Sequence, residues 1–159
     1  MDIHTKNVRA CNSMNSLDSG TQTKIVAVDG PAGSGKSTIC KMVGDKLGWS
    51  YVSTGKLYRA IGFLAEERNI DLENDEALVQ LAYEFGEHFV WKAFTDEIFF
   101  NDRNVTEFLY SIDAGAAASK VAKQPNFRSA LLPVQRKMAG FSETGVLFDG
   151  RDVGTVVFP

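Results

Sequence analysis

The sequence of 159 residues lacks several features that define whole classes of protein. It has only two cysteines, Cys11 and Cys40, which are too few for a disulfide scaffold and lack the spacing of zinc ligands. We therefore expect two reduced thiols, as in a cytosolic protein. No apolar run approaches the ~20 residues that a membrane-spanning helix needs, and no apolar signal region follows Lys6 and Arg9. These absences predict a cytoplasmic protein without a membrane partner.

Positive charge is also in short supply. Seventeen basic and 20 acidic residues give a formal net charge of −3. The acidic excess lies in residues 66–107, where three bases and twelve acids give −9, whereas residues 25–65 and 108–159 are locally positive. A protein that binds nucleic-acid polymers usually has a basic stripe and a positive total, so we expect no such partner. The positive flanks suit small anionic molecules instead.

Hydrophobic periodicity is missing from residues 1–23, which are rich in Ser, Asn, Thr and Asp. That composition predicts a disordered extension, and Met14 is as plausible a start as Met1. The chain as a whole is 44% hydrophobic and 23% charged, which is typical of a globular protein. Its length suits one domain, which we expect to occupy residues 24–159.

Within that domain, short apolar runs alternate with helical periodicity, which predicts an α/β fold built on a parallel sheet. Strands buried on both faces are expected at 25–28, 49–52 and 146–148. The aromatic-rich segment 88–106 has the pattern of a small antiparallel insertion, with Thr95 and Asp96 in its turn.

Helices are expected between these strands. In the first, 36–47, the stripe of Ile39, Met42, Val43 and Leu47 should face the core. Asn74 should cap a helix that carries Leu78, Leu81, Ala82 and Phe85. The other helices are expected at 56–68, at 111–123 and at 127–138, where Pro133 should kink or break the last one.

A glycine-rich segment lies between the first expected strand and the first expected helix. It matches the phosphate-loop pattern G-x-x-x-x-G-K-[ST] in full. Glycines allow positive φ and let backbone N–H groups approach phosphate oxygens, and the positive end of the helix dipole points to the same place. A nucleoside triphosphate, most simply ATP, is expected to bind at Gly30, Pro31, Ala32, Gly33, Ser34, Gly35, Lys36, Ser37 and Thr38.

Two side chains of this loop have expected chemical roles. Lys36 should span the β- and γ-phosphates, and Ser37 should place its hydroxyl on Mg²⁺. The loop does not define the acceptor, because GTPases, small-molecule kinases, nucleotide kinases and motor ATPases share it. A guanine-reading [NT]-K-x-D segment is absent from the sequence, which disfavours a regulatory GTPase.

Two further segments follow expected strands, where open α/β sheets bind their ligands. Ser53–Arg59 reads STGKLYR and Asp149–Pro159 reads DGRDVGTVVFP. Together with the phosphate loop and three shorter strings, these segments resemble the bacterial cytidylate kinase family from about residue 24 to residue 159. The shorter strings are ASKVA at Ala118–Ala122, PNFR at Pro125–Arg128 and QR at Gln135–Arg136.

The resemblance implies phosphorylation of CMP or dCMP by ATP. It places Arg59 and Thr54 at the acceptor phosphate, a role that suits the bidentate geometry of a guanidinium. It assigns the cytosine edge, which offers both donors and acceptors, to Ser119, Arg128 and Asp152. It sets Asp149 and Arg151 beside the acceptor and the phosphates, where they are expected to be catalytic together with Lys36. An Asp after an apolar strand also resembles a Walker B site that acts through Mg²⁺.

The sequence leaves a structural alternative open for several of these residues. Arg59 could be solvated on a helix face, Ser119 could pack between helices, Arg128 could pair with a surface carboxylate, and Asp149 could merely end a strand. Three positions depart from the family pattern: Ser53 replaces an acidic residue, Lys56 a small residue and Tyr110 an arginine.

The resemblance also implies a three-layer P-loop NTPase fold with a monophosphate-binding region at 54–140. The family has a five-stranded sheet and a lid, so the C-terminal strands and the lid would lie beyond Pro159 and one edge of strand 25–28 would lack a neighbour. We expect a monomer at full length and little kinase activity from these residues alone. The alternatives are a kinase for another acceptor, such as UMP or shikimate, and a nucleotide-binding chain without catalysis.

Overall fold

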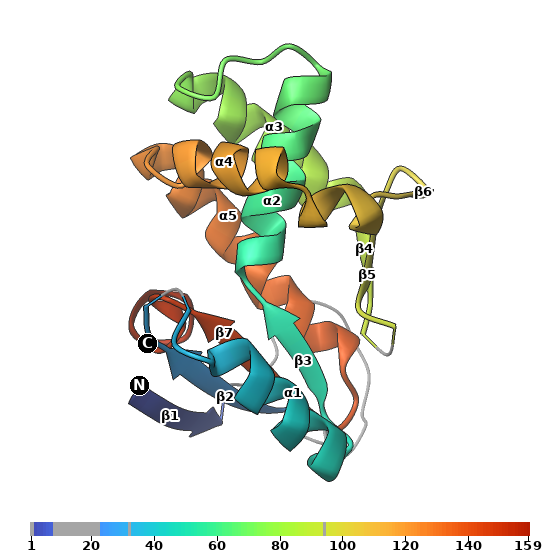
Figure 1. Cartoon of the computed structure of the whole chain (residues 1–159), viewed down its shortest axis with the longest axis vertical. Coiled ribbons are helices and arrows are strands. Elements are labelled where there is room, and N and C mark those ends of the chain that lie inside the picture. The colour runs from blue at the N-terminus through green and yellow to red at the C-terminus, as the bar shows by residue number, and fades with distance from the viewer. Residues whose placement is uncertain (1, 8–22, 32, 94) are drawn as a thin grey trace, which may run out of the picture. The chain divides into compact units, whose positions relative to one another are not determined.

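The chain divides into two units (Figure 1). The structure, a computed structural model, describes residues 2–7, 23–31, 33–93 and 95–159, the first of these ranges by its backbone alone. Met1–Ser53 and Arg136–Pro159 form the sheet unit, and Thr54–Gln135 form the helical unit, which the sequence analysis expected at 54–140. None of the helices in the described ranges is long and apolar enough to cross a membrane.

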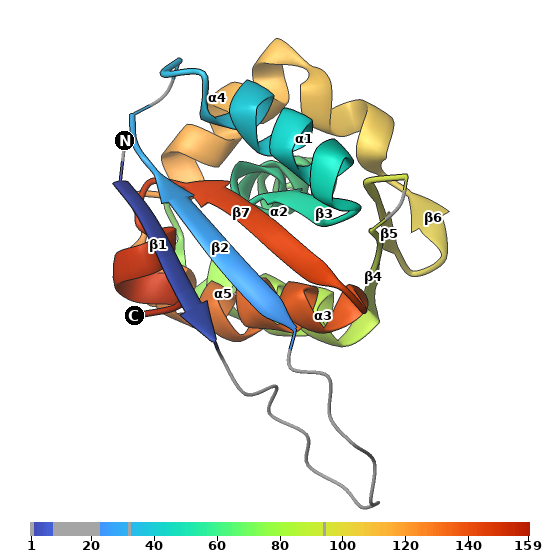
Figure 2. The same cartoon turned by 90° about the horizontal axis from the view of Figure 1, so that it is seen from below.

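The sheet unit contains a four-stranded sheet in the order β1-β2-β7-β3 (Figure 2). β7 (Gly145–Gly150) lies between β2 (Lys24–Asp29) and β3 (Ser50–Ser53) and pairs in parallel with both, which confirms the three expected strands and the parallel sheet. In this register Asp149 lies opposite Val28 on one side and Ser53 on the other. The carboxyl ends of all three strands therefore meet at one edge, where parallel sheets bind ligands.

β1 (Asp2–Asn7) covers the outer edge of β2 as an antiparallel strand, with Asp2 opposite Asp29. A disordered extension is predicted for residues 1–23, and the family resemblance leaves this edge of β2 without a neighbour; at residues 2–7 the structure differs on both points. An open strand edge exposes a row of unpaired backbone groups, so pairing with β2 gives a reason for a strand that hydrophobic periodicity does not indicate. Residues 8–22 lie outside the described residues.

α1 (Lys36–Leu47) begins and ends where expected and packs on one face of the sheet. Its buried side is formed by Cys40 and Gly44, whereas Ile39, Met42 and Leu47 of the expected core stripe are 46–57% exposed and Val43 is half-buried. That part of the prediction is wrong. A Cβ on Gly44 would lie 3.0 Å from the Trp49 carbonyl oxygen, so the close approach of the helix to the start of β3 requires its small-residue side.

The two faces of the sheet have separate cores. On the α1 side, Cys40 packs with Val28 and Leu147. On the other side the ring of Phe148 lies 5.0 Å from that of Phe158, just after the π-helical turn η3 (Val153–Val157). Side chains alternate between the faces of a strand, so Leu147 and Phe148 serve opposite layers. The remaining element of this unit is the 3-10 turn η2 (Met138–Phe141).

The helical unit combines four helices with a small antiparallel sheet (Figure 1). Asn74 caps the helix that begins at Asp75 by accepting a hydrogen bond from the Ala77 amide, as predicted. Ser111 caps the helix that begins at Ile112 by accepting one from the Ala114 amide. The sheet confirms the predicted β insertion. The elements are α2 (Gly55–Glu67), α3 (Asp75–His88), β4 (Phe89–Lys92), β5 (Glu97–Phe100), β6 (Arg103–Asn104), η1 (Thr106–Tyr110), α4 (Ile112–Val121) and α5 (Pro125–Lys137).

α5 runs through Pro133 without ending, so of the two expected effects, a kink or a break, the break is absent. Proline lacks an N–H and leaves the carbonyl of the residue four positions earlier, Ser129, without its helical donor. Both Pro133 and Ser129 are exposed, and water can therefore serve that carbonyl. The exposed position explains why the helix tolerates the proline.

Gly62 of α2 sets the distance between α2 and α4. A Cβ on this glycine would lie 2.9 Å from the Cβ of Ala117 and 3.1 Å from two atoms of the α4 backbone. We expect Gly62→Ala to lower the free energy of unfolding by roughly 1–3 kcal/mol, because the helices must move apart. Urea denaturation measures this change. Gly115→Ala is the matched control, since its Cβ would make only ordinary contacts and should change stability by less than about 1 kcal/mol; equal effects of both variants would contradict the prediction.

Candidate active site

The phosphate loop joins β2 directly to the first turn of α1. Gly33 and Gly35 have positive φ angles of 75° and 81°, as their expected role requires, because L side chains rarely adopt this conformation. Gly35 is also the N-terminal cap residue of α1, so the loop leads into the positive end of the helix dipole. Ala32 lies outside the described residues. This arrangement of strand, loop and helix can hold phosphate oxygens.

Lys36 carries the positive charge of the loop and is 8% exposed. Its Nζ donates to the carbonyl oxygen of Pro31 at 2.6 Å and to the hydroxyl of Ser34 at 3.4 Å. A buried ammonium requires such acceptors, and the loop supplies them from its own residues. Phosphate oxygens would be stronger, charge-assisted acceptors. Thr38, two positions later, is exposed.

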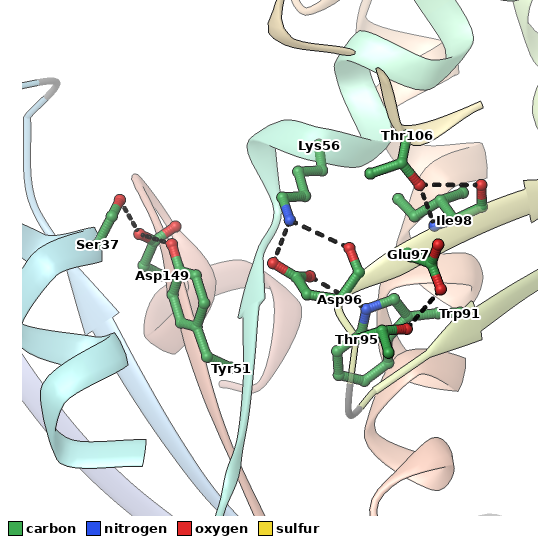
Figure 3. A network of polar contacts seen from close by, with 10 residues as sticks. All are labelled: Ser37, Tyr51, Lys56, Trp91, Thr95, Asp96, Glu97, Ile98, Thr106 and Asp149. Carbon is green, nitrogen blue, oxygen red and sulfur yellow. Dashed lines mark hydrogen bonds and ion pairs between the residues drawn. The ribbon is translucent and has the colours of Figure 1, made fainter. Parts of the chain in front are cut away.

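Asp149, at the end of β7, receives hydrogen bonds from two hydroxyl groups (Figure 3). The Ser37 hydroxyl donates to its Oδ2 at 2.5 Å and the Tyr51 hydroxyl donates to the same oxygen at 2.7 Å. Asp149 is 4% exposed, and it therefore does more than end a strand. Burial raises the pKa of Tyr51 well above its usual value, so its hydroxyl stays protonated and donates at neutral pH.

The donor set at this point suits magnesium held jointly with phosphates. Within the described ranges, no group of three or more His, Cys, Asp or Glu side chains could hold a metal ion. Ser37 and Asp149 offer one hydroxyl and one carboxylate, and oxygen ligands of this kind fit Mg²⁺. Magnesium is usually bound through one or two carboxylates, waters and substrate phosphates, so this pair fits an ion that arrives with a nucleotide.

Cys40, on the buried side of α1, has a perturbed thiol. Burial, with a further contribution from Asp149, raises its pKa to about 11. The thiolate is the reactive form, so in a Cys11→Ser variant we expect almost no reaction with a disulfide reagent at about pH 8 until denaturant is added. Rapid labelling of the folded variant would contradict the prediction.

The raised pKa of Cys40 also affects stability. The free energy of unfolding should fall as pH rises above roughly 9, because only the thiol of the unfolded chain then ionises.

The segment after β7 is held at both ends by charged side chains. Asp29, 8% exposed at the end of β2, accepts hydrogen bonds from the Val153 amide at 2.7 Å and the Gly154 amide at 2.9 Å. At the other end, Arg136 donates to the Val157 carbonyl at 2.7 Å. A carboxylate at the first N–H groups of η3 and a guanidinium at its last carbonyls both match the helix dipole.

Asp29 has no role among the predicted site residues, although a carboxylate directly before the phosphate loop is a visible signal. The segment that Asp29 holds begins with Arg151, which is exposed, and Asp152, which is half-buried. The backbone carbonyl of Asp152 accepts the Val156 amide at 2.9 Å and so starts η3. The two candidate residues thus stand immediately before a turn that is fixed by the end of β2.

In the helical unit, Thr54 and Arg59 belong to the first turns of α2. Thr54 is the N-terminal cap residue and is 6% exposed. Arg59 is half-buried, and its Nη1 donates to the Leu109 carbonyl at 2.8 Å. Its guanidinium also lies against α4, where a Cβ on Gly115 would be 3.7 Å from Nη2. Arg59 is therefore anchored to its own unit, and the alternative of a freely solvated side chain is wrong.

Ser119 and Arg128 lie on α4 and α5. Ser119 is exposed and its hydroxyl donates to the Gly115 carbonyl at 3.0 Å, a local bond one turn back in the helix, so it does not pack between helices. Arg128 is half-buried; its Nη1 donates to the Ala122 carbonyl at 3.4 Å, and its guanidinium lies 5.7 Å from the centre of the Tyr58 ring. The helical unit thus supplies two arginines whose guanidinium groups are both held by backbone carbonyls.

Lys56, one of the departures from the family pattern, has a structural partner. It is 8% exposed and forms an ion pair with Asp96 in the turn between β4 and β5 (Figure 3). The indole N–H of Trp91 donates to the same carboxyl group at 3.3 Å. The Lys56 Nζ also lies 5.7 Å from the centre of the Tyr110 ring, the second departure. The two departures are therefore in contact, and Lys56 ties the start of α2 to the turn of the insertion.

Comparison with known proteins identifies the chain at the family level. A family model described as cytidylate kinase matches residues 26–159, which include the phosphate loop, Asp149 and the segment after β7. The chain belongs to the cytidylate kinase family. The resemblance noted in the sequence is thereby confirmed, and the parallel sheet with its phosphate loop agrees with the P-loop kinase fold.

Curated members of the family align with most of this chain. A cytidylate kinase of Vibrio cholerae is 40% identical over 139 residues, which cover 87% of this chain and 61% of that protein. Those of Azotobacter vinelandii and Bdellovibrio bacteriovorus are also 40% identical, over 137 and 139 residues, covering 85% of this chain and 59% and 62% of theirs. The chain thus spans about 60% of the length of these relatives.

Proposed function

We propose that the protein transfers the γ-phosphoryl group of ATP to CMP or dCMP, giving ADP and CDP or dCDP. It would act in the cytoplasm as a monomer, on small nucleotides and without a nucleic-acid or membrane partner. The observation that carries the proposal is the hydrogen bond from Ser37 to Asp149 at the carboxyl ends of β2 and β7. It joins the phosphate loop to Asp149, the first residue of the segment Asp149–Pro159 that resembles the family. The family match supports the choice of acceptor.

On the donor side, Lys36 would leave the Pro31 carbonyl and bind the β- and γ-phosphates. Backbone N–H groups of the loop and the positive end of α1 would hold the same anion. Ser37 and Asp149 would hold the magnesium ion, which would supply positive charge that neutralises the phosphates. The reaction needs alignment and charge neutralisation and no covalent enzyme intermediate.

On the acceptor side, the proposed roles follow from side-chain chemistry. The Leu109 carbonyl engages one of the five donors of Arg59, which orients the guanidinium for a bidentate contact with the acceptor phosphate beside Thr54. Ser119, Arg128 and Asp152 would read the donor and acceptor edge of cytosine. Arg151, exposed after β7, would add positive charge at the transferred group together with Lys36, whereas the Asp149 carboxylate would act through the magnesium ion.

Binding and turnover are best tested separately, because the chain spans about 60% of its relatives' length. Calorimetry would measure the binding of CMP, dCMP and UMP, and a coupled assay would measure ADP production with each acceptor, with shikimate and without acceptor. We expect binding to be tightest with CMP and dCMP, and ADP production, which we expect to be low from these residues alone, to be greatest with the same two acceptors. Preference for UMP or shikimate would contradict the choice of acceptor. CMP binding without any ADP production would favour a nucleotide-binding chain without catalysis.

A further inference from the structure

The Asp149 carboxylate is approached from two different elements of the sheet unit. Ser37 reaches it from α1 and belongs to the phosphate-loop motif. Tyr51 reaches it from β3 and belongs to no motif that the sequence analysis identified. Both hydroxyls donate to the same oxygen, Oδ2, at 2.5 and 2.7 Å (Figure 3).

The register of the sheet explains how Tyr51 reaches this position. Tyr51 pairs with Leu147 in the parallel ladder of β3 and β7. Asp149 is two residues further along β7 and therefore points to the same face as Leu147. A tyrosine is long enough to reach a diagonal neighbour across strands. Its ring packs against the core of Val28, Cys40 and Leu147, which holds the hydroxyl in place.

A carboxylate held by one donor alone keeps much rotational freedom, because the terminal torsion of an Asp side chain is broad. The Ser37 hydroxyl is moreover a group that a divalent cation would engage. The Tyr51 hydroxyl, on the neighbouring strand β3, would keep the Asp149 carboxylate oriented when the Ser37 hydroxyl binds the cation. Supporting hydrogen bonds of this kind typically change metal affinity by about 10–100-fold.

We propose that Tyr51 is a positioning residue for the divalent cation. Its hydroxyl orients Asp149 against Ser37, so that the oxygen pair is set before the cation arrives with a nucleotide. This role rests on the proposed function, which assigns Ser37 and Asp149 to magnesium. It is a role in cation affinity, distinct from contact with the phosphates, and it predicts that metal-free nucleotide binding is independent of the Tyr51 hydroxyl.

The test is the Tyr51→Phe variant, which removes one oxygen and keeps the packed ring. Mn²⁺ replaces Mg²⁺ as a paramagnetic probe, and its binding in the presence of saturating ADP is followed by electron paramagnetic resonance. We expect the Mn²⁺ affinity to fall by about 10-fold or more, while ADP affinity measured with a chelator changes by less than about 2-fold. Tyr83→Phe is the control, because Tyr83 is 55% exposed on α3.

The outcomes separate the two proposals. Equal Mn²⁺ affinity in the wild type and Tyr51→Phe, with ADP-dependent Mn²⁺ binding present in both, overturns the role of Tyr51 and leaves the proposed function standing. No ADP-dependent Mn²⁺ binding in the wild type overturns the proposed function and the role of Tyr51 with it. Unchanged metal-free ADP binding by Tyr51→Phe shows that its phosphate loop is intact, so that a selective loss of Mn²⁺ affinity supports the proposal.

Discussion

Lys36→Ala is expected to weaken ATP binding by roughly 100- to 1,000-fold while the protein stays folded. Truncating one partner of a hydrogen-bonded charge pair typically costs binding about 2–5 kcal/mol, and the Lys36 residue is only 8% exposed. Stability should change by less than about 1 kcal/mol, because the two groups that now accept from its ammonium, on Pro31 and Ser34, belong to exposed residues that water can reach. Calorimetric titration with ATP and a thermal melt measure both quantities.

The matched control for this variant is Lys46→Ala. Lys46 is an exposed lysine in the last turn of the same helix, α1, so the change in net charge is identical. Its loss should leave ATP affinity within about 2-fold of the wild type, since exposed charges are screened by solvent and salt. ATP affinity that is unchanged in Lys36→Ala, or equally reduced in both variants, would be incompatible with a direct contact between Lys36 and the phosphates.

Features that depend on neighbouring residues in the chain were predictable from the sequence. The phosphate loop is one contiguous string, and its glycines Gly33 and Gly35 adopt the positive φ that the pattern requires. The bounds of α1 and the Asn74 cap agree with the prediction for the same reason. Each of these features is determined by local backbone chemistry within a few residues.

Features that depend on strand order and register were not predictable. Tyr51 becomes a partner of Asp149 only because β3 lies beside β7 in one register. The buried side of α1 is chosen by the close approach of Gly44 to Trp49, which overrides the larger apolar residues on the opposite side. β1 pairs with β2 in an antiparallel ladder, which the sequence does not indicate because residues 1–23 lack hydrophobic periodicity.

The departures from the family pattern show the same limit in the helical unit. Lys56 and Tyr110 are 54 positions apart and each looked like an isolated substitution, but the structure brings the ammonium within 5.7 Å of the ring centre. The ammonium is also paired with Asp96, which belongs to the acidic block of residues 66–107. A buried lysine needs such a carboxylate, because an unpaired charge in the interior is strongly unfavourable. The substitutions are therefore explained together, by a contact that no single motif contains.

Asp29→Ala is expected to lower the free energy of unfolding by roughly 2–5 kcal/mol. The carboxylate accepts the amides of Val153 and Gly154 at 2.7 and 2.9 Å, and both of these residues are buried. Each buried N–H left without an acceptor costs about 1–3 kcal/mol, and alanine offers no replacement. Urea denaturation measures the loss. Because Arg151 and Asp152 directly precede the released turn, ATP and CMP affinity should fall in the variant even under conditions where it remains folded.

Two further variants distinguish this specific role from a general effect of lost charge. Asp45→Ala removes an exposed carboxylate from α1 and should change stability by less than about 0.5 kcal/mol. Asp29→Asn keeps one oxygen acceptor but turns an amide group toward the second backbone N–H, so its loss should lie between those of the other two. A stability of Asp29→Ala within about 0.5 kcal/mol of the wild type would mean that other contacts are enough to hold η3, such as the hydrogen bonds from Arg136 to the Val156 and Val157 carbonyls. In that case the register between the end of β2 and the segment after β7 would depend on the parallel ladder, in which Asp29 already lies opposite Gly150.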